Sequence, residues 1–203
     1  MAKNKKKRKE KGYKFLRATL GWFFKFWYRP KVYGKENIPK DGPILITANH
    51  KHVMDQCAII VSTKRVIHYM AKKEYFDGRH AWFFKMAGCI SVDRSIHDEK
   101  AKQAALDVLE DGGAIGLFPE GTRNKTDAFL LPFKFGAVSM AKKTDAYLVP
   151  VGISGDYKFR TKNLRFYIGK PFKVGNMTLE QANEKLAKEI GKLMKQGQKE
   201  NKK

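Results

Sequence analysis

The stretch ILITANHKHVMD, residues 44–55, joins a short apolar run to a cluster of histidines and an acid. The first five residues, 44–48, have the apolar and β-branched composition of a strand. The polar residues follow at once, where open α/β sheets place their sites, beyond the carboxyl ends of the strands. The stretch therefore predicts a strand with a functional loop at its end.

On either side of this stretch, β-rich runs alternate with helical patterns. The predicted strands are 44–48, 66–71, 88–93, 114–118, 146–153 and 164–169. The predicted helices are 55–62, 81–87, 98–110 and 134–143. This alternation favours an α/β fold in which a mixed β-sheet is layered with helices. A length of 203 residues fits a single domain.

The two ends of the chain differ in composition. Residues 178–195 open with a capping box and carry an apolar stripe, which predicts a closing amphipathic helix. Residues 1–12 hold seven basic side chains, and we expect a disordered or loosely held arm or a solvated tail. The aromatic segment 13–28 predicts an amphipathic helix on a membrane surface, with a helix docked on the core as the alternative. We therefore expect residues 1–30 to form a basic arm and an interfacial helical segment, and residues 31–203 to form the folded body, whose motifs lie within 43–170.

The formal charge of +22 requires acidic partners, which include nucleic acid, anionic lipid and polyanionic cofactors. The chain has no RNP-like block, zinc finger or helix-turn-helix signature, so a basic nucleic-acid-binding protein is the weaker interpretation. Arg17 and Lys25 interrupt the most apolar segment, and we expect no membrane span. Cys57 and Cys89 have no partner at close spacing, which fits a reducing compartment.

His50 and Asp55 are the candidate catalytic residues. In one continuous helix they would lie roughly 140° apart, by the ~100° turn per residue, and could not meet. We therefore expect His50 in the loop and Asp55 at the start of the helix. The carboxylate would then orient the His50 ring as a general base, without a protein nucleophile. Alternatively, Asp55 only begins the helix and His50 is an ordinary loop residue.

Three further clusters carry candidate anion contacts. The motif GCISVDR, 88–94, contains a predicted strand that ends at an acid and Arg94. These two residues form either a surface ion pair or a contact to an anion. FPEGTR, 118–123, combines a glycine, which permits close backbone approach, with Arg123, which can fork onto phosphate oxygens. Lys134 is expected at a helix start, where free N–H groups and a cation favour a phosphate, or else as a surface lysine.

These blocks together resemble the glycerolipid acyltransferases of the lysophosphatidic acid acyltransferase type. The family's ordered motifs are NHx4D, GxxxxDR, FPEGTR and a VP-containing strand, found here at 49–55, 88–94, 118–123 and 149–151. The resemblance covers roughly residues 30–170. At three positions after His50, Lys51, His52 and Val53 depart from the usual residues, and Asn124 stands where serine is common. These departures leave the dyad intact and affect the choice of acceptor.

The resemblance implies a peripheral enzyme on the cytoplasmic face of the cell membrane, bound to an anionic membrane surface. It would transfer an acyl group from acyl-CoA or acyl carrier protein to lysophosphatidic acid, another lysophospholipid or glycerol 3-phosphate, and release the thiol. His50 and Asp55 would form the catalytic dyad. The remaining carried-over residues form the acceptor phosphate site: Arg94, Glu120, Gly121, Thr122, Arg123 and Lys134. The resemblance implies no bound cofactor, no metal and no nucleic acid partner.

Two other enzyme classes remain as alternatives. His50, His52 and Asp55 could begin a metal-ligand cluster, although further correctly spaced ligands would be needed. Cys57 could act as a nucleophile in a thioesterase-like enzyme, although its apolar neighbours favour a packed structural cysteine.

Overall fold

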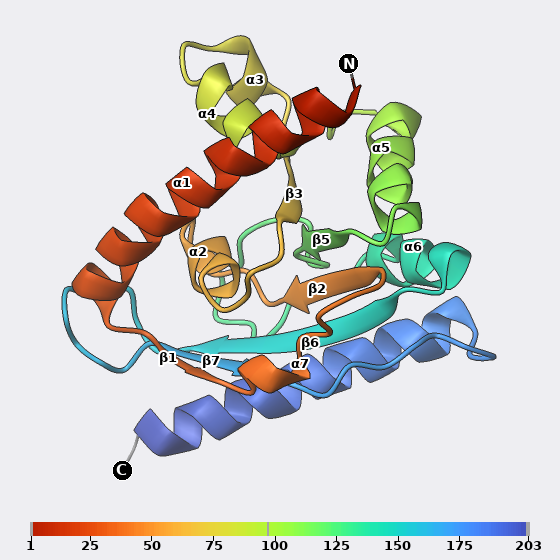
Figure 1. Ribbon diagram of the computed structural model, residues 1–203. Helices are drawn as coiled ribbons and strands as arrows, with labels where there is room; N and C mark the ends of the chain where they lie inside the picture. Colours follow the sequence, from red (N-terminus) through yellow and green to blue (C-terminus); the bar gives the residue numbers. More distant parts are fainter. Residues whose placement is uncertain (1, 97, 202–203) are drawn as a thin grey trace.

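The computed structural model describes residues 2–96 and 98–201, and within them the strands form one seven-stranded sheet (Figure 1). The strand order is β1-β7-β6-β2-β5-β3-β4. The strands are β1 (Lys31–Tyr33), β2 (Ile44–Ala48), β3 (Ile67–Lys72), β4 (Ile90–Val92), β5 (Ala114–Leu117), β6 (Tyr147–Ser154) and β7 (Arg165–Ile168). The helices are α1 (Ala2–Tyr28), α2 (Asp55–Ile60), α3 (Glu74–Asp77), α4 (Ala81–Met86), α5 (Glu99–Glu110), α6 (Gly136–Thr144) and α7 (Leu179–Asn201), with a 3-10 turn η1 at Lys35–Asn37.

The predicted α/β fold with a mixed sheet is confirmed. Every predicted strand is present, with ends displaced by no more than two residues. Strand β1 and helix α3 were not predicted, because three and four residues are too few to show a period in the sequence. The sheet is mixed because β7 runs antiparallel to β6, while β2 pairs in parallel with both β5 and β6.

Strand β2 lies inside the sheet and sets the edge at which the site forms. Its Ile44 is level with Ala114 of β5 and with Tyr147 of β6. Because these three strands are parallel, their carboxyl ends meet at the same edge of the sheet. The loops after β2, β5 and β6 therefore converge there.

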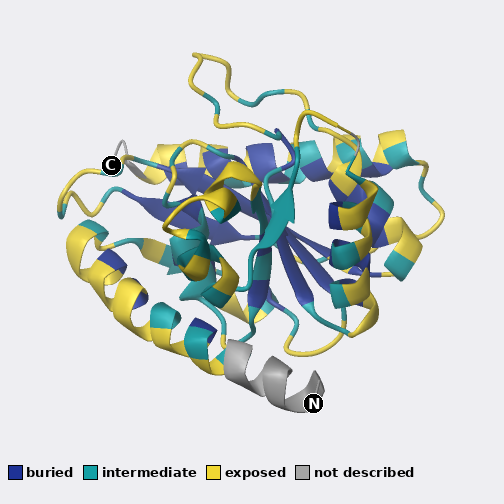
Figure 2. Ribbon diagram, turned by 90° about the horizontal axis from the view of Figure 1, so that it is seen from above, coloured by how far each residue is buried: buried dark blue, intermediate teal, exposed yellow. Residues whose placement is uncertain are grey.

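The sheet is covered on both faces, and all five residues of β2 are buried (Figure 2). On one face, Ile46 packs in a core with Ile59 of α2 and Phe24 of α1. On the other face, Leu45 packs with residues of α5, α6 and α7. Alternate residues of one strand thus serve two separate cores, as the pleat of a strand requires.

Helix α1 differs from the prediction at its start. It begins at Ala2, so residues 2–12 are helical, whereas a disordered or loosely held arm was expected. Lysine and arginine are good helix formers, and a helix already stabilised by packing propagates easily into such a segment. The helix also docks on the core, which was the alternative to the expected membrane-surface helix, since Tyr13 and Phe24 are buried. Among its outward-facing residues, Trp22 is 68% exposed.

Helix α7 confirms the predicted cap and extends beyond the predicted end. The backbone N–H of Thr178 donates to Gln181 at 2.9 Å, and the Gln181 N–H donates back to the Thr178 hydroxyl at 3.2 Å. The helix then continues to Asn201, past the expected residue 195. No helix in the described ranges has the length and apolar content to cross a bilayer.

Candidate active site

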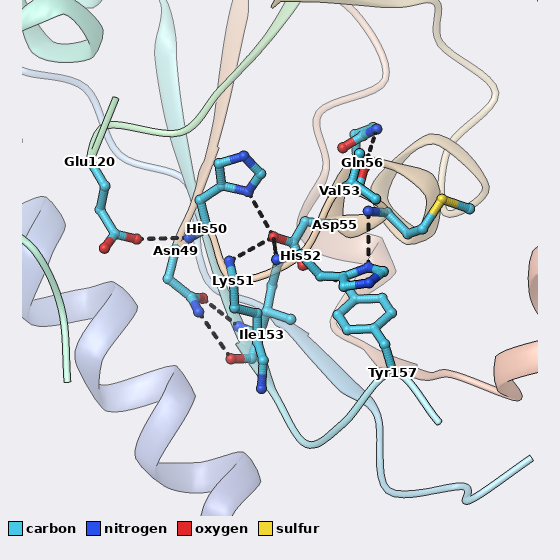
Figure 3. Close-up of polar contacts among 11 residues, drawn as sticks. Asn49, His50, Lys51, His52, Val53, Asp55, Gln56, Glu120, Ile153 and Tyr157 are labelled. Atoms are coloured by element: carbon cyan, nitrogen blue, oxygen red, sulfur yellow. Dashed lines mark hydrogen bonds and ion pairs between the residues drawn. The ribbon is translucent and has the colours of Figure 1, made fainter. Parts of the chain in front are cut away.

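Asn49 fixes the start of the loop after β2. Its side-chain oxygen accepts the backbone N–H of Ile153 at 2.7 Å, and its amide donates to the Ile153 carbonyl at 3.1 Å (Figure 3). Asn49 is 4% exposed, so both contacts are shielded from water. The amide group thereby extends the pairing of β2 with β6 by one residue. This pairing determines where the next residue, His50, leaves the sheet.

His50 and Asp55 meet as the sequence predicted. His50 lies in the loop, Asp55 is the first residue of α2, and His50 Nδ1 is 2.8 Å from Asp55 Oδ2 (Figure 3). The same oxygen accepts the backbone N–H groups of Lys51 and His52, each at 2.8 Å. The turn between the two residues therefore positions the carboxylate with its own backbone. No part of the Asp55 side chain is exposed.

Tyr157, from the loop after β6, completes the surroundings of Asp55. Its hydroxyl donates to Asp55 Oδ1 at 2.5 Å, and its ring stacks on His52 with centroids 4.1 Å apart. Burial, and next the Asp55 carboxylate, raise the pKa of Tyr157, so the hydroxyl remains a donor. The sequence analysis missed this residue. It lies 102 positions from Asp55, and no local pattern links the two.

The His50 ring has one nitrogen engaged and one directed outward. Its face stacks on Phe118, with ring centroids 3.9 Å apart and planes inclined by 11°. Nδ1 faces Asp55, while the other ring nitrogen points away from the carboxylate (Figure 3). The His50 side chain is 18% exposed. A histidine held in this way can accept a proton from a bound hydroxyl.

Glu120 braces the loops around His50. One carboxylate oxygen accepts the His50 backbone N–H at 2.7 Å, and the other accepts the Leu131 N–H at 2.9 Å. Asn124 adds a backbone bond to the His50 carbonyl at 2.7 Å. Burial raises the pKa of Glu120, against the opposing effect of its two N–H donors. The described contacts of Glu120 are thus structural, and its expected part in binding an acceptor stays a prediction.

Gly121 brings two cations together. Arg94 donates to the Gly121 carbonyl at 3.0 Å. A Cβ atom at Gly121 would lie 2.9 Å from Lys134 Cε, so the lysine chain passes directly over the glycine. Gly121 also has a positive φ of 72°, which disfavours other residues. The glycine of the 118–123 cluster therefore lets the Lys134 chain pass close to the backbone, and its expected part in binding an acceptor stays a prediction.

Arg123 and Thr122 lie on the exposed side of the same turn. The positive charge of Arg123 is one of the influences that lower the pKa of His52, after the larger effect of burial. Within the described residues, Arg94, Arg123 and Lys134 have no carboxylate partner. The turn at 118–123 therefore presents unpaired positive charge near the histidine loop.

The expected position of Lys134 needs a correction. Helix α6 begins at Gly136, so Lys134 lies before the helix and not in its first turn. Its backbone N–H donates to the Pro119 carbonyl at 2.8 Å and is not free for an anion. That bond ties the chain just before α6 to the 118–123 turn. What Lys134 offers a phosphate is the ammonium group alone.

The alternatives raised by the sequence can be compared with this geometry. Burial raises the pKa of the Cys57 thiol to about 12, so the thiol stays protonated near neutral pH and is a poor nucleophile. His52 Nδ1 accepts the Met54 N–H at 3.2 Å. Across the described residues, no three His, Cys, Asp or Glu side chains are grouped as metal ligands would be.

This arrangement defines a class of enzyme. A histidine oriented by a buried carboxylate can activate a substrate hydroxyl, and the adjacent cations can hold an anionic group of that substrate. The Acyltransferase family profile matches residues 29–154, more than half of the chain. The chain belongs to this family and is an acyltransferase.

Individual relatives agree with this assignment. The chain is 32% identical to a Bacillus subtilis protein named 1-acyl-sn-glycerol-3-phosphate acyltransferase, over 86% of the chain and 89% of that protein. It is 34% identical to a Borreliella burgdorferi protein of the same name, over 68% of the chain and 56% of that longer protein. The crystal structure of a 1-acyl-sn-glycerophosphate acyltransferase from Thermotoga maritima matches with a TM-score of 0.75 and 25% identity, covering 92% of this chain and 81% of that one.

Proposed function

We propose that this chain is a 1-acyl-sn-glycerol-3-phosphate O-acyltransferase. It would move a fatty acyl group from the thioester of coenzyme A or acyl carrier protein to the sn-2 hydroxyl of lysophosphatidic acid, giving phosphatidic acid. The observation that carries this proposal is the His50–Asp55 pair, at 2.8 Å, beside the unpaired cations of the 118–123 turn. The names of the relatives at 32% and 34% identity support the choice of acceptor.

The reaction follows from the placement of His50. Its outward ring nitrogen takes the proton of the acceptor hydroxyl as the oxygen attacks the thioester carbonyl. The tetrahedral intermediate collapses, the C–S bond breaks, and the imidazolium returns the proton to the leaving thiolate. Asp55 stabilises the imidazolium between these two proton transfers. All atoms and charges balance without a covalent enzyme intermediate.

The acceptor phosphate is assigned to Arg123, with Arg94 and Lys134 in support. Arg123 is exposed, and a guanidinium forms paired hydrogen bonds with phosphate oxygens. The Arg94 and Lys134 side chains converge on Gly121, three residues after Phe118, which stacks on His50. The reacting hydroxyl of a lysophosphatidate would then lie toward His50. Thr122, in the same turn, is kept as a further acceptor contact.

Tyr157 is proposed as a positioning residue. With its hydroxyl on Oδ1 and the turn N–H groups on Oδ2, Asp55 has donors on both oxygens. A carboxylate fixed in this way cannot rotate away from His50. Tyr157 acts on the substrate only through Asp55.

Helix α1 is proposed to hold the enzyme on an anionic membrane surface, at the cytoplasmic face. Its exposed aromatic residues include Phe15 at 63% and Trp22 at 68%. Aromatic side chains together with basic residues are typical of helices lying in the lipid interface. Because Tyr13 and Phe24 are buried, deleting the helix would also damage the core. Outward-facing substitutions such as Trp22→Ala are the better test of membrane binding.

The deciding experiment measures thiol release from a long-chain acyl-CoA by the purified protein, with and without lysophosphatidic acid. Wild type is compared with His50→Ala, and acyl carrier protein thioesters are tested in the same way. Release that depends on the acceptor and is lost in the variant is expected. Release without acceptor would indicate a thioesterase and would overturn the proposal. Acceptor-dependent release with glycerol 3-phosphate or another lysolipid, and not with lysophosphatidic acid, would reassign the substrate.

A further inference from the structure

An open pocket of about 560 Å³ lies where the end of α1 meets β1, η1 and the loop between β6 and β7. Its lining carries five cations, Lys25, Arg29, Lys31, Lys35 and Lys162, and no acid. Within the part of the chain that is described, none of the five forms a salt bridge. Such a concentration of unpaired positive charge around a hollow favours a polyvalent anion.

The pocket is separate from the dyad. Neither His50, Asp55 nor any residue of the 118–123 turn lines it. Its apolar lining comes from Pro30, Val32 and Val61. The cations of the pocket are therefore additional to those proposed to bind the acceptor phosphate.

The backbone around the pocket is strained at two of its cations. Arg29 has a φ of 45° and Lys162 a φ of 59°, both in the left-handed region that residues other than glycine rarely occupy. Strain of this kind persists where the surrounding structure enforces it, and it concentrates at functional sites. Both strained residues, Arg29 and Lys162, are basic and line the pocket.

Exposed aromatic side chains lie on two of the segments that carry the pocket cations, the end of α1 and the loop between β6 and β7. Trp27 of α1 packs against Phe159 of the loop, with ring centroids 4.6 Å apart. The Arg160 backbone N–H donates to the Trp27 carbonyl at 2.8 Å. Trp27 and Phe159 remain 39% and 54% exposed. Aromatic rings beside cations are the composition that meets acyl chains and headgroups together at a lipid surface.

We propose that this pocket binds the phosphate of an anionic phospholipid headgroup in the surface on which the enzyme sits. The inference rests on the proposed membrane contact and adds a discrete headgroup site to it. Phosphate groups also occur in coenzyme A, which shares the same chemistry. The exposed aromatic residues Trp27 and Phe159 on the same segments favour the lipid, because aromatic side chains insert at a lipid surface and a soluble nucleotide offers them no apolar phase.

Three lysines provide the cleanest test. Lys25 and Arg29 lie at the carboxyl end of α1, where the backbone carbonyls favour cations, so a ligand is not needed to explain the positive charge at these two positions. Lys31, Lys35 and Lys162 lie outside α1 and have no such explanation. The test variant is therefore Lys31→Gln, Lys35→Gln and Lys162→Gln combined. The matched control replaces Lys143, Lys170 and Lys188 by Gln, which are exposed lysines that do not line the pocket.

Sedimentation with phosphatidylglycerol vesicles measures the interaction without acyl donor or acceptor, so it is independent of the transfer reaction. One lysine at an anionic surface contributes roughly a fivefold factor in binding, so the pocket variant should bind on the order of 100-fold more weakly. The control should bind within a few-fold of wild type, and phosphatidylcholine vesicles should not separate the variants. Thermal unfolding of both variants verifies that the sheet and helices are intact.

The outcomes separate the possible sources of the phosphate. Equal losses in the pocket variant and the control would mean that only net charge matters, and would overturn the site. Weaker binding of coenzyme A by the pocket variant, with vesicle binding unchanged, would assign the pocket to the donor and overturn the lipid proposal. Loss of vesicle binding confined to the pocket variant, with coenzyme A binding unchanged, supports the proposal even if the acceptor of the reaction proves different.

Discussion

The two halves of the candidate site differ in how fully their side chains are bonded. The dyad half is complete: Asp55 is buried and accepts from backbone, His50 and Tyr157. The cationic half is open, since Arg123 and Lys134 are exposed and pair with no carboxylate in the described ranges. A general base must be oriented before the substrate arrives. A phosphate site, in contrast, binds its ligand more tightly when its cations have no protein carboxylate as a competing partner. Substitutions in the two halves should therefore fail in different ways.

The largest effect is expected at the base. His50→Ala should lower kcat by a factor on the order of 10²–10⁴, because the ring proposed to take the hydroxyl proton is lost. Folding should be retained, since the backbone contacts of His50 to Glu120 and Asn124 do not involve its ring. Thiol release and circular dichroism together check this. A variant with residual kcat near wild type would remove His50 from the mechanism.

A smaller effect of another kind is expected in the cationic half. Arg123→Ala should raise the acceptor KM by about 10- to 100-fold, the range of a charge-assisted hydrogen bond, with kcat little changed. The reason is that the phosphate does not react and is held equally before and during transfer. Arg79→Ala, at an exposed arginine that is not part of the site, is the control. An unchanged acceptor KM would contradict the phosphate assignment.

Tyr157→Phe should affect catalysis without affecting substrate binding, as expected for a residue of the dyad half. Loss of the hydroxyl should lower kcat by about tenfold while leaving both KM values unchanged, because one donor to Asp55 disappears. A lower kcat with both KM values unchanged is the result expected of a residue that orients the base and does not bind substrate. Tyr147→Phe, at an exposed tyrosine of β6, is the control. A purely structural role would lower thermal stability and leave kcat of the folded enzyme near that of wild type.

Glu120 provides a test by pH. Burial raises its pKa above the ordinary 4.5, so between that value and the folded pKa the folded chain binds more protons than the unfolded chain. The contribution of Glu120 to stability therefore falls as pH rises through this window. The free energy of unfolding of wild type relative to Glu120→Gln should accordingly increase as pH is lowered from 7 toward 5. Urea unfolding of both proteins measures this difference, and a decrease instead would show that the two N–H donors outweigh burial.

The smallest effect is expected at Cys57. With a thiol pKa of about 12, Cys57 is not ionised at neutral pH, and Cys57→Ala should keep kcat/KM within about twofold. The same thiol-release assay checks this. A loss comparable with that of His50→Ala would introduce a protein nucleophile into the dyad half and end the direct-transfer mechanism.

The sequence by itself determined the alternation of strands and helices, the loop after β2, and the contact of His50 with Asp55. These features depend on short-range patterns: apolar periodicity, and a spacing of five residues that only a turn can close. The family motifs at 49–55, 88–94 and 118–123 likewise lie in consecutive residues at strand ends, where parallel strands bring them to one edge, whereas the motif at 149–151 lies within β6.

Only the tertiary structure decided which distant groups complete the site. Tyr157 reaches Asp55 across 102 positions, and the Glu120 carboxylate reaches the His50 amide across 70. The bond of Lys134 to Pro119 places the lysine before α6, and the burial of Tyr13 and Phe24 fixes α1 on the core. None of these contacts follows from local propensity. Each contact joins loops that are far apart in the sequence and that become neighbours only because of the strand order of the sheet. A pattern of neighbouring residues carries no information on that order.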